Sequence, residues 1–115
     1  MDFGEILGIN QLNLSYNTRV EDFDGENFTY SIYFDDGASE EKKTEVDSAV
    51  EGFLSKHSND YMGYIDVSVV EGKIFIYHDL GGVEPENNNL AIQELLKALD
   101  DVTGIKEVII NEMEL

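Results

Sequence analysis

The feature that most restricts the possible folds of this chain is a pair of apolar segments separated by only two residues. Segments 64–70 and 73–79 are rich in β-branched and aromatic side chains, and residues 71–72 are Glu-Gly. A two-residue turn of this kind closes an antiparallel hairpin and sets its register. The register places Val67 opposite Ile76 on an aliphatic face. The opposite face then carries Asp66, Ser68, Phe75 and Tyr77.

Apolar periodicity predicts the remaining elements. Alternation over residues 27–34 predicts another strand, and helical spacing predicts helices over 40–57 and from about 87–89 to 102. Ser39 is the expected cap of the first helix, and residues 106–113 form a final strand. The order β-α-β-β-α-β predicts an α+β fold, the ferredoxin-like split arrangement, with both helices on one face of a mainly antiparallel sheet.

The region before residue 27 is less regular. Leu12, Leu14 and Tyr16 alternate with polar residues and predict a weak extra N-terminal strand, followed by a polar connection over residues 18–27. We expect a single domain over residues 1–115. Its predicted core contains Val46, Val50, Phe53, Val67, Val69, Ile74, Ile76, Leu95 and Leu99.

The charge of the chain restricts its partners. There are 25 Asp and Glu against 7 Lys and Arg, and the formal net charge is −18. Such a chain is repelled by nucleic acid and by anionic lipid, so the expected partner is a basic protein. With 42% hydrophobic residues in periodic runs, the charge does not indicate disorder. No apolar run of membrane-spanning length, no basic start of a signal peptide and no Cys are present, so we expect a cytoplasmic location.

Residues that could carry chemistry are few. His57 falls at the end of the first predicted helix, where a cation is favoured by the helix dipole, and His78 is expected to face the helices. A calcium loop beginning at Asp22 would need Gly at position 27, which is Asn. Residues 81–82 are Gly-Gly but lack the following Lys of a phosphate loop. We expect no enzyme activity, no cofactor and no specific metal site.

The sheet face away from the two helices is the most interesting predicted surface. Tyr33, Phe75 and Tyr77 should point to it, because two helices cover only one side of a sheet. These rings could be ordinary half-exposed aromatics, or the N-terminal segment could fold over them, or they could form a contact platform. RNA-binding sheets surround such rings with Lys and Arg, whereas here Asp66 and Asp79 accompany them.

Acidic residues form three clusters in the sequence. The first flanks the strand 27–34, the second lies over residues 79–86, and the third contains Glu107, Glu112 and Glu114. Exposed aromatic rings provide desolvated anchors in protein interfaces, and charges around them steer association. The predicted partner-binding residues are Asp22, Asp24, Glu26, Tyr33, Asp35, Asp36, Tyr77, Asp79, Glu84 and Glu86.

In size, acidity and domain type, the whole chain resembles bacterial toxin-immunity proteins, including those of contact-dependent growth inhibition. The resemblance implies an immunity protein that binds and neutralises a basic toxin, such as a nuclease. We expect the free protein to be a monomer or weak dimer. Two alternatives remain open: a nucleic-acid mimic that inhibits a DNA-binding or restriction protein, and a small-molecule-binding regulatory domain.

Overall fold

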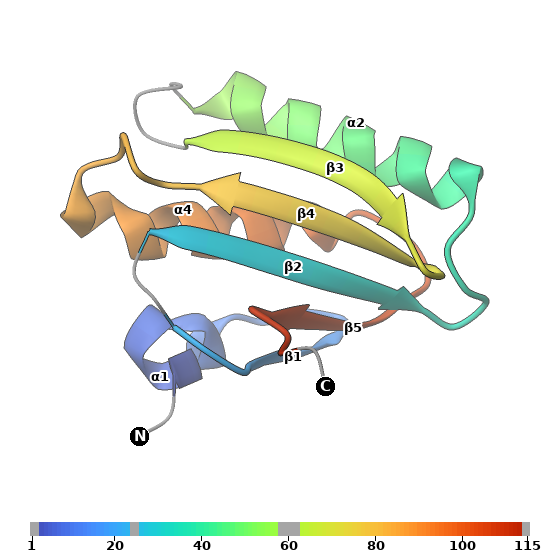
Figure 1. Ribbon diagram of the computed structural model, residues 1–115, viewed down its shortest axis with the longest axis horizontal. Coiled ribbons are helices and arrows are strands. Elements are labelled where there is room, and N and C mark those ends of the chain that lie inside the picture. Colours follow the sequence, from blue (N-terminus) through green and yellow to red (C-terminus); the bar gives the residue numbers. More distant parts are fainter. Residues whose placement is uncertain (1–2, 24–25, 58–62, 114–115) are drawn as a thin grey trace.

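A computed structural model describes residues 3–23, 26–57 and 63–113 of the chain (Figure 1). Within these residues the protein is α+β, with a mixed five-stranded sheet and three α-helices. The elements in chain order are α1 (Phe3–Leu7), the 3-10 helix η1 (Ile9–Gln11), β1 (Asn17–Val20), β2 (Asn27–Phe34), α2 (Glu40–Lys56), β3 (Tyr64–Val70), β4 (Lys73–Asp79), α4 (Pro85–Leu99) and β5 (Ile105–Ile110).

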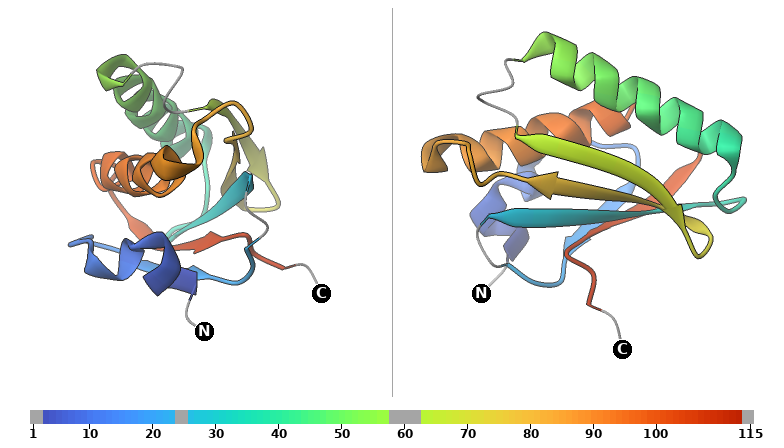
Figure 2. Two further views of the ribbon diagram at one scale, coloured as in Figure 1. Left: turned by 90° about the vertical axis from the view of Figure 1, so that its left-hand side faces the viewer. Right: turned by 45° about the horizontal axis from the view of Figure 1, so that its top comes forward.

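The sheet has the strand order β1-β5-β2-β4-β3. The pairs β5-β2, β2-β4 and β4-β3 are antiparallel, whereas β1 runs parallel to β5. Helices α2 and α4 lie side by side on one face of the sheet, and none of the described helices lies on the other face (Figure 2). The predicted arrangement of two helices on one face is therefore confirmed.

The hairpin β3-β4 has the register expected from its turn. Val67 pairs with Ile76, and Ser68 pairs with Phe75. The turn residues Glu71 and Gly72 have φ values of 48° and 81°. Two successive left-handed residues match the twist of the flanking strands, and this is why a Glu-Gly turn works here.

The hydrophobic core lies between the sheet and the two helices. Its fully buried members include Tyr30, Ile74, Ile76, Leu95 and Leu99. The prediction that Val69 is buried is wrong, because its side chain is 41% exposed, and Val67 is only partly buried. Both residues belong to β3, which is at the edge of the sheet, so one flank of each side chain meets solvent.

The two long helices begin with different caps. The side-chain oxygen of Ser39 accepts a hydrogen bond from the backbone N–H of Lys42, as predicted for α2, and His57 occupies the C-cap position. The prediction that the second helix begins at Asn87–Asn89 is wrong, since α4 begins at Pro85. Proline is well suited to the first helical position because its missing N–H has no partner there.

The N-terminal region differs most from the prediction. Residues 12–16 form no strand, and the extra strand is β1, which overlaps the start of the segment expected to be a polar connection. Tyr16 is buried and its hydroxyl donates to the carbonyl oxygen of Leu96 in α4, at 2.5 Å. Gln93 of α4 donates to the carbonyl of Leu7 at 2.8 Å. The alternation over 12–16 therefore reflects an extended segment that packs along α4 without a strand partner.

Candidate partner-binding surface

The sheet face opposite α2 and α4, called the open face below, carries the side chains that alternate with the core residues. Two of them, Ser31 and Ile109, are themselves buried. Helix α1 does not cover the open face, since α1 lies beside the sheet on the side of α4 (Figure 2). Strand register places on this face Arg19, Thr29, Ser31, Tyr33, Tyr64, Asp66, Ser68, Val70, Lys73, Phe75, Tyr77, Asp79, Glu107 and Ile109.

A cluster of three side chains organises the open face. Tyr33 donates its hydroxyl hydrogen to the Oε1 atom of Glu112 at 2.5 Å, and the Nζ atom of Lys73 lies 3.1 Å from the same oxygen. The ammonium group also lies 5.6 Å from the centre of the Tyr33 ring and 6.0 Å from that of Phe75. These cation–π contacts hold both rings in place on the sheet.

The same cluster shifts the pKa values of its members. Partial burial raises the pKa of Glu112, but hydrogen bonds from Tyr33 and Lys73 outweigh it and hold the pKa below its usual value. Burial and the carboxylate of Glu112 raise the pKa of the Tyr33 hydroxyl. The phenol therefore stays protonated and remains a donor to Glu112 at neutral pH.

The cations of the open face are paired with carboxylates. Arg19 contacts Glu21 at 3.0 Å and Glu107 at 2.9 Å, and Lys73 contacts Glu112 at 3.1 Å. Glu21 also accepts from the backbone N–H of Met113, and this bond together with Arg19 lowers the pKa of Glu21. Since each cation is balanced, Asp66 and Asp79 leave the face with an excess of negative charge.

Five of the predicted acids lie at one end of the sheet, where β2 begins and β4 ends (Figure 1). Asn27 pairs with Asp79, and the backbone N–H of Leu80 donates to the carbonyl of Glu26. The connection after β1 and the loop before α4 reach the same end. The acids that the structure brings to this end are Asp22, Glu26, Asp79, Glu84 and Glu86; Asp24 lies outside the described residues.

Asp35 and Asp36 lie at the opposite end of the sheet, in the turn after β2 (Figure 1). The interpretation of one acidic cluster around β2 is therefore wrong. An extended strand advances about 3.4 Å per residue, so the nine steps from Glu26 to Asp35 separate the two flanking acidic groups by roughly 30 Å. The acids form two groups with the aromatic rings between them.

The third predicted cluster is not a free acidic patch. Glu107 and Glu112 are engaged with Arg19 and Lys73, and Glu114 lies outside the described residues. Sequence reasoning did not assign Lys73 or Glu112 to the aromatic surface. The hairpin register already places Lys73 two residues from Phe75 and on the same face, whereas no local pattern places Glu112, which follows the end of β5.

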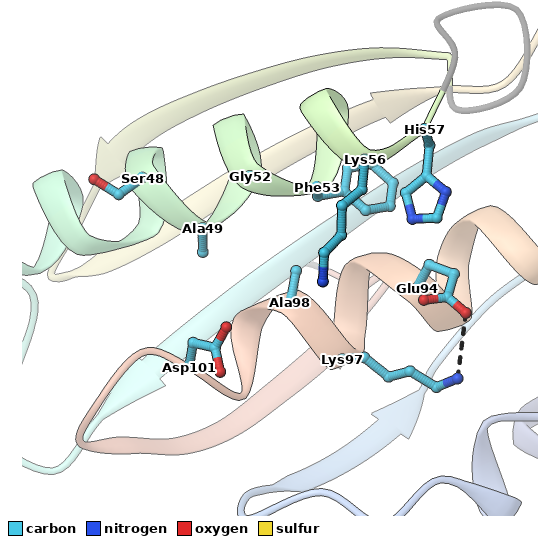
Figure 3. A pocket seen from close by; sticks show the side chains of 10 residues that line it. All are labelled: Ser48, Ala49, Gly52, Phe53, Lys56, His57, Glu94, Lys97, Ala98 and Asp101. Carbon is cyan, nitrogen blue, oxygen red and sulfur yellow. Dashed lines mark hydrogen bonds and ion pairs between the residues drawn. The ribbon is translucent and has the colours of Figure 1, made fainter.

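A concave region lies between α2 and α4, on the outer side of the helix layer (Figure 3). It has a volume of about 470 Å³. Lys56 extends from α2 across it, and Lys97 on α4 pairs with Glu94 at 3.2 Å (Figure 3). The residues that line this groove are Ser48, Ala49, Gly52, Phe53, Lys56, His57, Glu94, Lys97, Ala98 and Asp101.

In the part of the chain that the structure describes, no three His, Asp or Glu side chains converge in a way that could hold a metal ion. None of its helices combines the length and apolar character needed to cross a membrane.

Comparison of the chain with family models, with curated proteins and with solved structures gives no significant match.

Proposed function

We propose that this protein is an immunity protein that binds and neutralises a basic toxin through the open face, without enzymatic activity of its own. The observation that carries the proposal is the arrangement of this face. Half-buried rings of Tyr33, Phe75 and Tyr77 lie at its centre, and acidic groups lie at both ends of the sheet. We further propose that the fold is ferredoxin-like with an added strand, which the order β5-β2-β4-β3 supports.

The dimensions of the open face suit one protein partner. A standard interface buries about 800 Å² on each partner, which corresponds to a patch nearly 30 Å across. The two acidic groups are separated by roughly 30 Å along β2. A single partner centred on Tyr33 and Tyr77 would therefore reach both groups, so that acids rim the contact while rings fill its centre.

The electrostatics favour a partner that normally binds polyanions. A nuclease presents a basic surface to phosphates, and carboxylates spaced over the same distance compete for that surface. Complementary potentials raise association rates to about 10⁸–10⁹ M⁻¹s⁻¹ at low salt. Binding over the toxin's substrate-binding surface excludes substrate, and neutralisation then requires no covalent chemistry.

The test uses the purified product of the adjacent gene in the source genome as the binding partner. Association and dissociation rates are measured over a range of ionic strength for the wild type and for the double variant Asp35→Asn/Asp36→Asn. We expect slower association and a weaker salt dependence for the variant. The matched control is Glu5→Gln/Glu51→Gln, which removes two charges on the helical side and should leave association nearly unchanged.

The central rings require a separate variant. Tyr77→Ala should accelerate dissociation by an amount equivalent to about 2 kcal/mol or more if the ring is a hot spot. If Asp35→Asn/Asp36→Asn associates as fast as the control Glu5→Gln/Glu51→Gln, the acids near β2 do not steer the partner. If Tyr77→Ala also leaves dissociation unchanged, the partner does not use the open face and the proposal is wrong.

The two alternative functions predict different results in binding and thermal-stability measurements. A nucleic-acid mimic would bind a DNA-binding or restriction protein through the same charges and would ignore a toxin. A regulatory domain would gain thermal stability from a small ligand without any protein, and the groove lined by Lys56 and Lys97 is where an anionic ligand would fit.

A further inference from the structure

We propose that the outer edge of β3 is a second interaction surface, at which two copies of this chain pair antiparallel about a twofold axis at Val67. This interface is at the edge of the sheet, and the proposal is independent of the function proposed above. It would join the two sheets into one continuous sheet and leave both open faces exposed.

The first argument is that β3 is an edge strand that no other described strand covers. Natural edge strands are kept from pairing by shortness, Lys, Pro or covering segments. β3 has seven residues, YIDVSVV, of which one is charged and none is Lys or Pro. Among the described residues it pairs only with β4. Tyr64, Val69 and Val70 are 64%, 41% and 39% exposed.

The other edge of the sheet is different. β1 has four residues, and its Arg19 is paired with Glu21 and Glu107. A short strand with an engaged charge offers little to a second strand. The contrast assigns pairing to β3 alone, so association through this edge closes at a dimer instead of growing into a fibre.

The second argument concerns the backbone of β3. In a hairpin with a two-residue turn, the residues that flank the turn exchange both backbone hydrogen bonds, and such pairs alternate with non-hydrogen-bonded pairs. Val70 and Lys73 flank the turn. By alternation from this pair, the N–H and C=O groups of Ile65, Val67 and Val69 point away from β4 and toward the outer edge.

The third argument is the symmetry of the side-chain pattern. With Val67 opposite Val67 of the second copy, Ile65 faces Val69 and Tyr64 faces Val70, so apolar residues meet in every outer pair. The outward backbone groups then also meet one another, as an antiparallel ladder requires. Asp66 faces Ser68, and no two carboxylates are directly opposite. A shift of one residue in either direction loses this match.

Charge limits the strength of the pairing. Each copy carries a net charge of −18, and the two Asp66 side chains are diagonal neighbours in this register. The buried area of one edge pairing is small, so the expected dimer is weak and forms between micromolar and near-millimolar concentration. Added salt should strengthen it by screening the repulsion.

The test is sedimentation equilibrium of the full chain over that concentration range, with variants at Ser68. Ser68→Lys places a cation opposite Asp66 of the other copy, twice per dimer, and should tighten the dimer about tenfold. Ser68→Glu places an anion there and should weaken it by a similar factor. Asn13→Lys and Asn13→Glu make the same charge changes at an exposed site far from β3 and serve as controls.

A backbone variant tests the edge itself. Val69→Pro removes an outward N–H and leaves the β3-β4 ladder intact, so the variant should fold, as judged by thermal unfolding, and remain monomeric. A wild type and a Ser68→Lys variant that stay monomeric throughout overturn the proposal. A dimer that persists in Val69→Pro overturns the proposal as well. So do Ser68 variants whose dimer affinity changes no more than that of the Asn13 controls, and oligomers larger than a dimer.

Discussion

The hydroxyl oxygen of Tyr30 lies 2.8 Å from the Nδ1 atom of His78, and both side chains are completely buried between the sheet and the helices. Burial, with a smaller contribution from Tyr16, raises the pKa of Tyr30 well above its ordinary value. The phenol therefore stays protonated and can donate to Nδ1 when the His78 proton is on Nε2. The imidazole also packs against the ring of Phe53. His78, expected to face the helices, is a core residue.

The first prediction concerns this buried pair. Tyr30→Phe should lower the free energy of unfolding by about 1–3 kcal/mol, because the hydrogen bond between the Tyr30 hydroxyl and Nδ1 of His78 is lost inside the core. The measurement is urea unfolding at neutral pH. Tyr77→Phe removes a hydroxyl from the open face and should change stability by less than about 0.5 kcal/mol. Equal effects of the two variants would contradict the prediction.

The second prediction concerns two glycines that both have left-handed backbone. Gly37 has a φ of 80° with no atom within 4 Å of an added Cβ, whereas at Gly63 (φ 76°) a Cβ would lie 2.3 Å from the carbonyl oxygen of Asp79. Gly37→Ala should lower stability by about 1–2 kcal/mol through backbone strain alone. Gly63→Ala should lower it by about 3 kcal/mol or more, since the end of β4 must move. The measurement is thermal unfolding of both variants. A similar loss of stability in the two would contradict the predicted clash between the added Cβ at Gly63 and the carbonyl oxygen of Asp79.

The third prediction is a pH dependence from Glu112. A carboxyl whose pKa is lowered by folding stabilises the protein above its unfolded pKa, near 4.3, and loses this contribution as the pH falls through the folded value. Glu112→Gln should therefore destabilise the protein at pH 7, by less than about 1 kcal/mol because the pair is partly exposed. The difference between wild type and variant in urea unfolding should shrink below about pH 4. A constant difference at all pH values would show that charge is not involved.

The fourth prediction follows from the net charge of −18. Self-repulsion among the carboxylates destabilises the compact state, and salt screens it. Raising sodium chloride from low to physiological ionic strength should increase the melting temperature by roughly 5 °C, equivalent to about 1 kcal/mol for a domain of this size. Magnesium chloride at equal ionic strength should add little further. A large excess effect of magnesium would reveal a specific cation site.

Local patterns in the sequence were sufficient for the hairpin and for the start of α2. The turn at Glu71-Gly72 sets every pair between β3 and β4, because a two-residue loop allows one register. Ser39 marks the start of α2 because its side-chain oxygen accepts a hydrogen bond from the backbone N–H of Lys42, which has no partner within the helix. These features depend on contacts between residues close in the sequence, so the local sequence is enough to predict them.

The N-terminal strand and the candidate surface depended on tertiary structure. β1 pairs with β5, about ninety residues later in the chain, and Tyr33 meets Glu112 across a separation of 79 residues. No local periodicity encodes such distant contacts, because each segment would be compatible with other partners until the core closes. The sequence determined that acids flank the strand 27–34 and that aromatics lie on it. The extended geometry of β2 decided that those acids lie at opposite ends of one sheet face, with the rings between them.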